Sequence, residues 1–264
     1  MQFRPTLWAT IVVIPMLAVL IGLGVWQLQR LDWKEELIAL RVERITAPPI
    51  DLVPRNRVER LTDPGQFELR LAPDKGVAML SDDPESFEYR PIRLAGTFRH
   101  DRAVRLLSRT RDGIVGVHVV TPLDLPQGGG TVYVDRGWVA QADAQRPDGY
   151  ARPEGRTIVE GHVRRFAEPG SFTPDNPADS DGWYWLDPAA LAARTGDGTA
   201  TAFYVQAGPD DSGAAPFGSA PDIALRNPHL EYALTWFGVA GALVGVYIAF
   251  HIRRRDGNED SGTA

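Results

Sequence analysis

Two long apolar runs, residues 7–28 and 232–250, lie near the two ends of the chain, and neither contains a charged residue. At about 1.5 Å of rise per residue, a helix over either run can cross a hydrocarbon core about 30 Å thick. A cleaved signal peptide is the alternative for the first run. That run is longer than a usual signal sequence, and Gln27-Leu28-Gln29-Arg30 offers no small-residue cleavage pattern. The pattern therefore predicts a hairpin of two membrane-spanning helices.

The charges beside the second run predict the orientation of this hairpin. Arg253–Arg255 form a basic cluster of the kind that is retained on the cytoplasmic side, whereas Arg30 and Lys34 oppose this assignment weakly. We expect a multi-pass protein of the cell inner membrane with both termini in the cytoplasm. The expected parts are a cytoplasmic N-terminus (1–6), transmembrane helices (7–28 and 232–250), a periplasmic domain (29–231) and a cytoplasmic tail (251–264).

Between the two runs the pattern is mostly that of short strands. Helical spacing continues from the first run to residue 45 and stops at Pro48-Pro49, and residues 54–84 have the Pro, Gly and Asp content of loops and short elements, with a brief strand at Phe67–Leu71. Alternating apolar positions then predict strands at Tyr89–Phe98, Ala103–Leu107, Val117–Leu123, Thr131–Asp135, Arg156–Arg165, Trp183–Trp185 and Phe203–Ala207.

One internal helix has clear boundary signals. Asp187 is a good N-cap, Pro188 suits the first turn, Ala189–Arg194 are helix formers, and Gly196 suits the C-cap. The fold class that we predict is a membrane protein with two transmembrane helices that flank a strand-rich α+β extracytoplasmic domain, sheet or barrel-like.

Composition narrows the function. The net charge of −6 is spread along the chain, so the basic surface of a nucleic-acid-binding protein is not expected. The chain has no cysteine, which excludes thiolate copper delivery and haem attachment through C-x-x-C-H, and its three methionines are too few for a methionine copper site. Without disulfides, the domain must be stabilised by packing.

Catalytic motifs are weak in the strand-rich region. Gly128-Gly129-Gly130 fits a hairpin turn better than a phosphate loop, and a triad of His118, Asp135 and Ser108 lacks a G-x-S-x-G elbow. His100 and His162 are expected to be solvated surface histidines. The segment Asp135-Arg136-Gly137-Trp138 is either a recognition loop or a strand-end ion pair beside a packed tryptophan. An enzyme in this domain is the least favoured interpretation.

The outer ends of the two helices carry the candidate binding site. Antiparallel helices bring one set of polar and aromatic residues to the same depth: Gly24, Trp26, Gln27 and Arg30 on the first helix side, and Arg226, His229, Tyr232 and Trp236 on the second. The spacing places His229, Tyr232, Ala233 and Trp236 on one helix face. Ala18-x-x-x-Gly22 and Gly241-x-x-x-Gly245 predict close helix packing. A ligand role for His229 and an ordinary aromatic belt both fit this pattern.

Seven motifs, in order along nearly the whole chain, carry a resemblance to a known family. They are Gly24-Val-Trp-Gln-Leu-Gln-Arg30, Tyr89-Arg-Pro91 with Gly96-Thr-Phe98, His118-Val-Val-Thr-Pro122, Val134-Asp-Arg-Gly-Trp-Val139, Glu168-Pro-Gly-Ser-Phe172 through Asn176-Pro177, Trp185-Leu-Asp187, and Asn227-Pro-His229-Leu-Glu-Tyr232-Ala-Leu-Thr-Trp236. In this order and inside a two-span hairpin, they closely resemble the surfeit locus protein 1 family.

The resemblance implies a function and a site. It implies an assembly factor, not an enzyme, that acts like a chaperone in respiratory-chain biogenesis: it binds haem a transiently and assists its insertion into the catalytic subunit of haem-copper cytochrome c oxidase. The implied haem ligand, and so the implied metal ligand, is His229. Tyr232, Trp236, Gly24, Trp26 and Gln27 are the other implied haem-binding residues, and Arg30 and Arg226 would pair with the propionates.

Partners follow from the same resemblance: the oxidase catalytic subunit, haem a synthase and membrane lipid, with no nucleic acid. The alternative is a membrane scaffold that holds oxidase subunits or haem a synthase without binding haem. Pro228 replaces a polar residue common in the family, and the segment Ala214–Ala220 departs from the family's glycine-rich pattern.

Overall fold

The computed structural model describes residues 2–3, 5–52, 69–71, 73–177, 179–196, 201–210, 212–222 and 225–253. The chain divides into two compact units. One comprises the segments from residues 1–40 and 224–264, and the other runs over residues 41–223. The expected outer domain of residues 29–231 therefore corresponds to a sheet unit with narrower limits.

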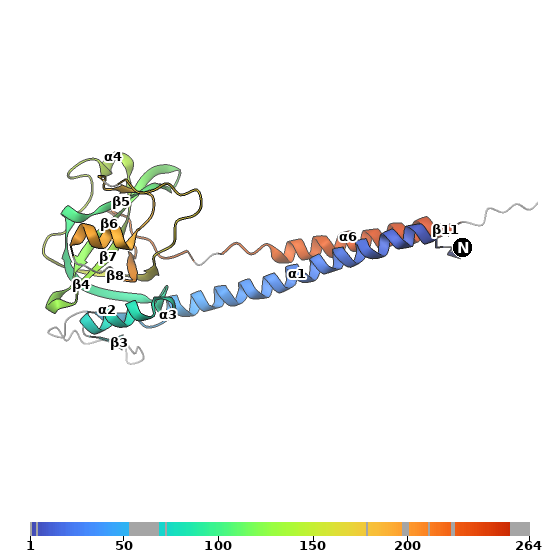
Figure 1. Cartoon of the computed structure of the whole chain (residues 1–264), viewed down its shortest axis with the longest axis horizontal. Coiled ribbons are helices and arrows are strands. Elements are labelled where there is room, and N and C mark those ends of the chain that lie inside the picture. The colour runs from blue at the N-terminus through green and yellow to red at the C-terminus, as the bar shows by residue number, and fades with distance from the viewer. Residues whose placement is uncertain are drawn as a thin grey trace, which may run out of the picture. The chain divides into compact units, whose positions relative to one another are not determined.

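The first unit is an antiparallel pair of helices, α1 (Leu7–Thr46) and α6 (His229–His251) (Figure 1). Both helices are long and apolar enough to cross a membrane. Strand β1 (Gln2–Phe3) pairs antiparallel with β11 (Ile252–Arg253), so the two described chain ends lie at the same end of the helix pair. Arg254 and Arg255, on which the predicted orientation partly depends, lie outside the described residues.

Helix α1 has 40 residues and is about 60 Å long at 1.5 Å per residue, which is about twice the thickness of a hydrocarbon core. It begins at Leu7 and ends at Thr46, as the apolar run and Pro48-Pro49 predicted. Its last turn belongs to the sheet unit, where the Arg44 guanidinium donates to the Glu85 carbonyl at 2.8 Å and Arg41 stacks over the Tyr89 ring.

The second unit is a nine-stranded sheet. Its strands are β2 (Ile50–Leu52), β3 (Leu69–Arg70), β4 (Pro91–Phe98), β5 (Val104–Arg111), β6 (Ile114–Asp124), β7 (Thr131–Ala140), β8 (Arg156–Arg165), β9 (Gly182–Trp183) and β10 (Phe203–Ala207). Their order is β3-β2-β4-β8-β10-β7-β6-β5-β9. The shorter elements are α2 (Pro73–Asp82), α3 (Pro84–Phe87), α4 (Gln141–Ala144), α5 (Pro188–Thr195) and the turns η1 (His100–Arg102) and η2 (Pro126–Gly128).

An additional pairing closes part of this sheet into a barrel. The end of β4 pairs with the end of β6 through Thr97↔Asp124 and Phe98↔Leu123, so β4, β8, β10, β7 and β6 form a ring of five strands. The main core fills this ring with apolar side chains from alternate strand positions. Its members include Ile92, Leu94, Leu123, Val132, Val134, Val159, Val163, Phe203 and Val205. The barrel-like expectation is therefore confirmed.

Helix α5 closes a second core cluster outside the ring. The predicted caps form: Asp187 Oδ1 accepts from the backbone N–H groups of Ala189 (2.9 Å) and Ala190 (3.1 Å), and Gly196 ends the helix in the left-handed region at φ +77°. Leu191 is buried against a set of side chains from the outer face of the strands, including Val104, Val120, Tyr133 and Trp183.

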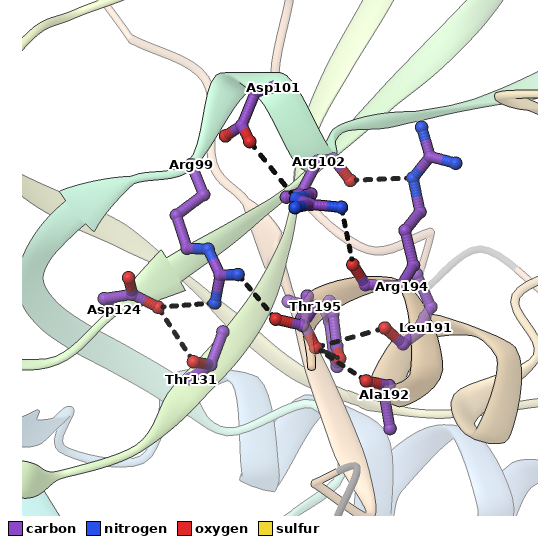
Figure 2. A network of polar contacts seen from close by, with 10 residues as sticks. Arg99, Asp101, Arg102, Asp124, Thr131, Leu191, Ala192, Arg194 and Thr195 are labelled. Atoms are coloured by element: carbon purple, nitrogen blue, oxygen red, sulfur yellow. Dashed lines mark hydrogen bonds and ion pairs between the residues drawn. The ribbon is translucent and has the colours of Figure 1, made fainter. Parts of the chain in front are cut away.

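Arginine side chains fasten the C-terminal end of α5 to the strands (Figure 2). Arg99 donates to the Thr195 carbonyl at 2.6 Å and pairs with Asp124 at 3.6 Å, while Arg102 donates to the Arg194 carbonyl at 3.3 Å. These donors satisfy carbonyls that lack partners at a helix C-terminus. The network therefore fixes α5 against the β4–β5 connection.

Two expectations about the sheet unit need correction. Residues 54–84 were expected to hold loops and short elements. Residues 73–82 instead form the ten-residue helix α2, and its Leu80 is fully buried in the main core. His100 and His162 were expected to be solvated, but both are half-buried: His100 Nε2 lies 2.9 Å from the Pro153 carbonyl oxygen, and on β8 burial together with Arg164 lowers the pKa of His162. The brief strand expected at Phe67–Leu71 survives as β3, and Phe67 lies outside the described residues.

Candidate functional site

The contact face between α1 and α6 follows a spacing of three and four residues on both helices. On α1, between residues 9 and 34, buried or half-buried residues occur at positions 9, 10, 13, 17, 20, 23, 24, 27, 31 and 34. On α6 they occur at residues 229, 233, 236, 237, 240, 243, 247 and 251. Such spacing is typical of a left-handed helix pair with interlocking side chains. Gln27 and His229 both belong to these two rows.

Close approach of the helices depends on one glycine. A Cβ added at Gly24 would lie 2.5 Å from Cε1 of Phe237, so no side chain fits there without displacement of that ring. The expected small-residue motifs do not take part. A Cβ added at Gly22, Gly241 or Gly245 would meet no described atom within 4 Å, and Ala18 is exposed. The prediction of close packing was right for Gly24 and wrong for these motifs, because the helices are rotated to pack Ala233 and Ala240 instead.

His229 is the first residue of α6, and its side chain is fixed by a polar partner on α1. Nδ1 of His229 lies 2.7 Å from Oε1 of Gln27. Because an amide oxygen can only accept, Nδ1 carries the proton, and a neutral imidazole then has its lone pair on Nε2. Within the described part of the chain, no residue forms a hydrogen bond with this Nε2. A histidine oriented through Nδ1 with Nε2 available has the arrangement found in protein metal ligands.

The other predicted aromatic site residues differ in how far they are exposed. Trp236 is half-buried two turns further along α6 than His229, whereas Tyr232 is 52% exposed. Trp26 is also 52% exposed on α1. These aromatic side chains are therefore available to an apolar ligand or to lipid.

The two predicted arginines stay at the surface. The Arg30 guanidinium lies over the ring of its own neighbour Trp33, 4.2 Å from the centroid, and Arg226 is exposed before the start of α6. The structure thus joins Gln27 to His229 and places Gly24 in the same interface. It forms no bond between either arginine and His229.

A second polar cluster lies at the opposite end of the helix pair and was not predicted. The hydroxyl of Thr10 lies 2.5 Å from the Tyr247 hydroxyl, and His251 is bonded through Nε2 to the Thr6 hydroxyl (2.8 Å) and through Nδ1 to the Tyr247 carbonyl (2.7 Å). His251 is 3% exposed. The signal was available in the sequence, because Tyr247 and His251 are four residues apart and Thr6 and Thr10 match them on the first helix.

The catalytic alternatives in the sheet unit gain little support. His118 Nδ1 does lie 2.9 Å from Asp135 Oδ2, but Asp135 also accepts from the Gly137 N–H, and Ser108 forms no bond with this pair. Gly128–Gly130 form the expected turn of the β6–β7 hairpin, closed by the Leu125 N–H and the Gly130 carbonyl at 2.9 Å. Among the described residues there is no cluster of three or more histidine, aspartate or glutamate side chains that could hold a metal ion.

The segment Asp135-Arg136-Gly137-Trp138 does not form the strand-end ion pair that was one of its two interpretations. Asp135 is bonded to His118, while Arg136 lies on the other side of β7, donates to the Ala151 carbonyl at 2.6 Å and stacks over Phe98. Neighbouring residues of a strand point to opposite faces, which separates the two charges. Trp138 is buried and stacks on Phe217, as the packed-tryptophan expectation required.

Comparison with known proteins identifies the family. The sequence model of the SURF1 family matches residues 14–241 of the chain. The chain is 29% identical over 252 residues to a SURF1-like protein of Monosiga brevicollis, covering 90% of this chain and 84% of that protein. It is 30% identical to Surfeit locus protein 1 of Mus musculus (88% and 72% covered) and of Homo sapiens (84% and 70% covered). The chain therefore belongs to the SURF1 family.

Proposed function

We propose that the protein is an assembly factor for haem-copper cytochrome c oxidase that binds haem a through His229 and assists its insertion into the catalytic subunit. Membership of the SURF1 family points to a role in oxidase assembly. The observation that carries the haem-binding part is the bond between His229 Nδ1 and Gln27 Oε1, since it leaves Nε2 free to bind iron. Haem a is cargo in this proposal, and the oxidase catalytic subunit and haem a synthase are the partners.

The surroundings of His229 suit a large, mostly apolar macrocycle that must later be released. Trp26, Tyr232 and Trp236 offer aromatic surface at the same end of the helix pair. Arg30 and Arg226 are exposed and able to pair with propionates. A single histidine ligand favours modest affinity, which a transfer factor needs in order to give up its cargo.

We also propose that α1 and α6 span the inner membrane with both termini in the cytoplasm and the sheet unit in the periplasm. The β1–β11 pairing supports this, because it holds both chain ends at one end of the helix pair. A reporter that is active only in the periplasm should be silent when fused after Ala264 and active when inserted in the surface turn at Asp112-Gly113. The reverse pattern would overturn the orientation.

The haem proposal is tested with the full chain purified from cells that make haem a. His229→Ala should abolish the bound haem or change its absorption spectrum. Gln27→Leu should lower haem affinity by about tenfold or more, because removal of the group that orients a metal-binding histidine commonly costs 10- to 100-fold. The matched control is His251→Ala, which alters the second histidine of the same interface, one whose two nitrogens are already bonded.

The outcomes separate binding from helix packing. Loss of haem in the His229 variant alone supports the ligand role. Equal loss in both histidine variants indicates a damaged helix pair. Wild-type haem content and spectrum in an abundant His229→Ala protein would overturn the proposal and favour a scaffold that holds oxidase subunits or haem a synthase without binding haem.

A further inference from the structure

A groove of about 920 Å³ opens at one end of the five-stranded barrel, within the sheet unit. Phe98 at the end of β4, Thr157 at the start of β8 and Ala207 at the end of β10 all line it. The antiparallel registers of β8 with β4 and β10 bring these three positions to the same end of the ring. Mouths of barrels are common places for ligands, and this volume lies within the range of about 300–1,000 Å³ that small-molecule pockets occupy.

Arg136 lies in this groove with one nitrogen of its guanidinium unpaired among the described residues. It is 8% exposed, and its Nη1 is buried without a hydrogen-bond partner among the described residues. Its Nη2 donates to the Ala151 carbonyl at 2.6 Å, and its guanidinium carbon lies 4.9 Å from the centroid of the Phe98 ring. No described carboxylate forms an ion pair with it. Burial lowers its pKa to about 10, so the guanidinium still carries its charge at neutral pH.

The backbone directs Arg136 into the groove. The β6–β7 register shifts between His118↔Trp138 and Val120↔Asp135, which inserts one extra residue in β7 and places Arg136 and Gly137 in a bulge. Gly137 has φ +114°, and an added Cβ would lie 2.2 Å from the Phe217 carbonyl oxygen. Bulges of this kind redirect side chains and are frequent beside binding sites. The position of Arg136 is therefore built into the strand.

The far wall of the groove is also held in place. The segment of residues 212–218 is fastened by reciprocal backbone bonds between Phe217 and Trp138 (2.8 and 3.0 Å) and by the bond from the Ala151 N–H to the Ala215 carbonyl (2.8 Å). The Ser219 N–H donates to the Ala207 carbonyl at 3.0 Å. A preformed wall reduces the conformational entropy that the protein loses when a ligand binds.

The charged residues of the groove indicate the charge of a matching ligand. Arg93, Arg136 and Arg152 contribute three positive charges, and Glu160 and Asp210 contribute two negative charges, which leaves one net positive charge. Glu160 already pairs with Arg93 at 3.3 Å, and Asp210 accepts from the Ser212 hydroxyl at 2.6 Å. The lining also offers apolar surface from Phe98, which contacts Arg136, and from Val134 and Ile158, the last 47% exposed.

We propose that this groove binds a small molecule that carries one carboxylate on an apolar body, with Arg136 as the carboxylate-binding residue. A buried polar group without a partner is rare in folded proteins and costs stability, and a guanidinium offers paired donors that match a carboxylate. A monoanion balances the net charge of the lining, whereas a phosphate would exceed it. The proposal does not depend on haem binding at His229, which belongs to the other unit.

Benzoate is the probe, because it combines one carboxylate with an apolar ring. Binding to the full chain in detergent micelles is measured by saturation-transfer NMR, with benzamide as the neutral analogue and inorganic phosphate as the competing anion. Benzoate should bind and benzamide should not. Arg136→Met should weaken benzoate binding by about tenfold or more, the loss expected for a charge-assisted hydrogen bond of about 1.5–3 kcal/mol.

Two further variants keep the test decisive. Arg136→Lys retains a charge and a donor for Ala151 but lacks the paired geometry, so it should also weaken binding about tenfold. Arg146→Gln is the control, since Arg146 is exposed, pairs with Asp143 and lies outside the groove, and it should bind benzoate as the wild type does. Equal benzoate binding by all four proteins, binding of phosphate without binding of benzoate, or no binding of either anion would each overturn the proposal.

Discussion

Gly24→Ala is the sharpest test of the helix pair, because a single added carbon meets one identified side chain. The new Cβ would lie 2.5, 2.6 and 2.9 Å from three atoms of the Phe237 ring. Carbon atoms pack best at about 3.5–4.0 Å, so the ring or the helix must move by about 1 Å. Overpacking of this kind costs about 1–3 kcal/mol, which corresponds to a decrease of about 5- to 150-fold in the association equilibrium of the helices.

Two variants isolate this steric effect. Gly22→Ala makes the same chemical change two residues away on α1, where an added Cβ meets no described atom within 4 Å, so it carries the same gain in helix propensity of about 1 kcal/mol without the clash. Phe237→Ala removes the ring. In that background Gly24→Ala should no longer weaken the pair, and the double-mutant cycle should give a coupling energy of about 1–3 kcal/mol.

The assay uses the absence of cysteine from the chain. With Thr10→Cys and Tyr247→Cys introduced, whose parent side chains are in contact, a bismaleimide links α1 to α6 only when the helices are associated. Intact-mass spectrometry gives the rate of linkage in each variant. Equal rates for Gly24→Ala and Gly22→Ala, or a Gly24→Ala defect that persists without the Phe237 ring, would refute the reasoning.

Two predictions concern the stability of the sheet unit, followed by urea unfolding of the full chain in micelles. Asp187→Ala should lower its stability by about 1 kcal/mol through loss of the α5 N-cap, and Asp187→Ser should restore most of this; no difference between them would contradict the capping role. Because burial lowers the pKa of His162 below its ordinary 6.5, the unfolded chain binds the proton first as the pH falls, so stability declines below about pH 6.5. The loss between pH 7.5 and pH 5.5 should be smaller in His162→Asn, and an equal loss would contradict this origin.

The sequence predicted the elements whose signals are local. The cap residues of α5 and the alternating strands from residue 89 onward are set by neighbours in the chain, and both were confirmed. Helix α2 was missed because Pro73 and Gly76 resemble loop residues. The burial of Leu80, which stabilises that helix, depends on strands that are distant in sequence.

The sequence predicted which residues of the candidate site lie at the same level along the helix pair, but not how each helix is rotated about its axis. Because the helices are antiparallel, Gln27 and His229 were expected at the same level, and their side chains are hydrogen-bonded to each other. Which small residues face the partner helix depends on the rotation of each helix about its axis. The contact of Gly24 with Phe237 sets this rotation, and it turns Gly241 and Gly245 away. The direction of the Arg136 side chain, whose Nη1 lacks a partner among the described residues, is set by the bulge in β7, which no local pattern indicated.

The position of β10 determines when during synthesis the barrel can close. This strand is the last of the sheet in chain order, yet it lies between β7 and β8 and pairs with both. Until residue 207 has emerged, β7 and β8 each keep an open edge, and open edges invite pairing with other chains. Only about twenty residues separate β10 from the start of α6. Closure of the barrel and emergence of the second apolar helix are thus nearly simultaneous, and the nascent chain keeps these two strand edges unpaired until β10 has been made.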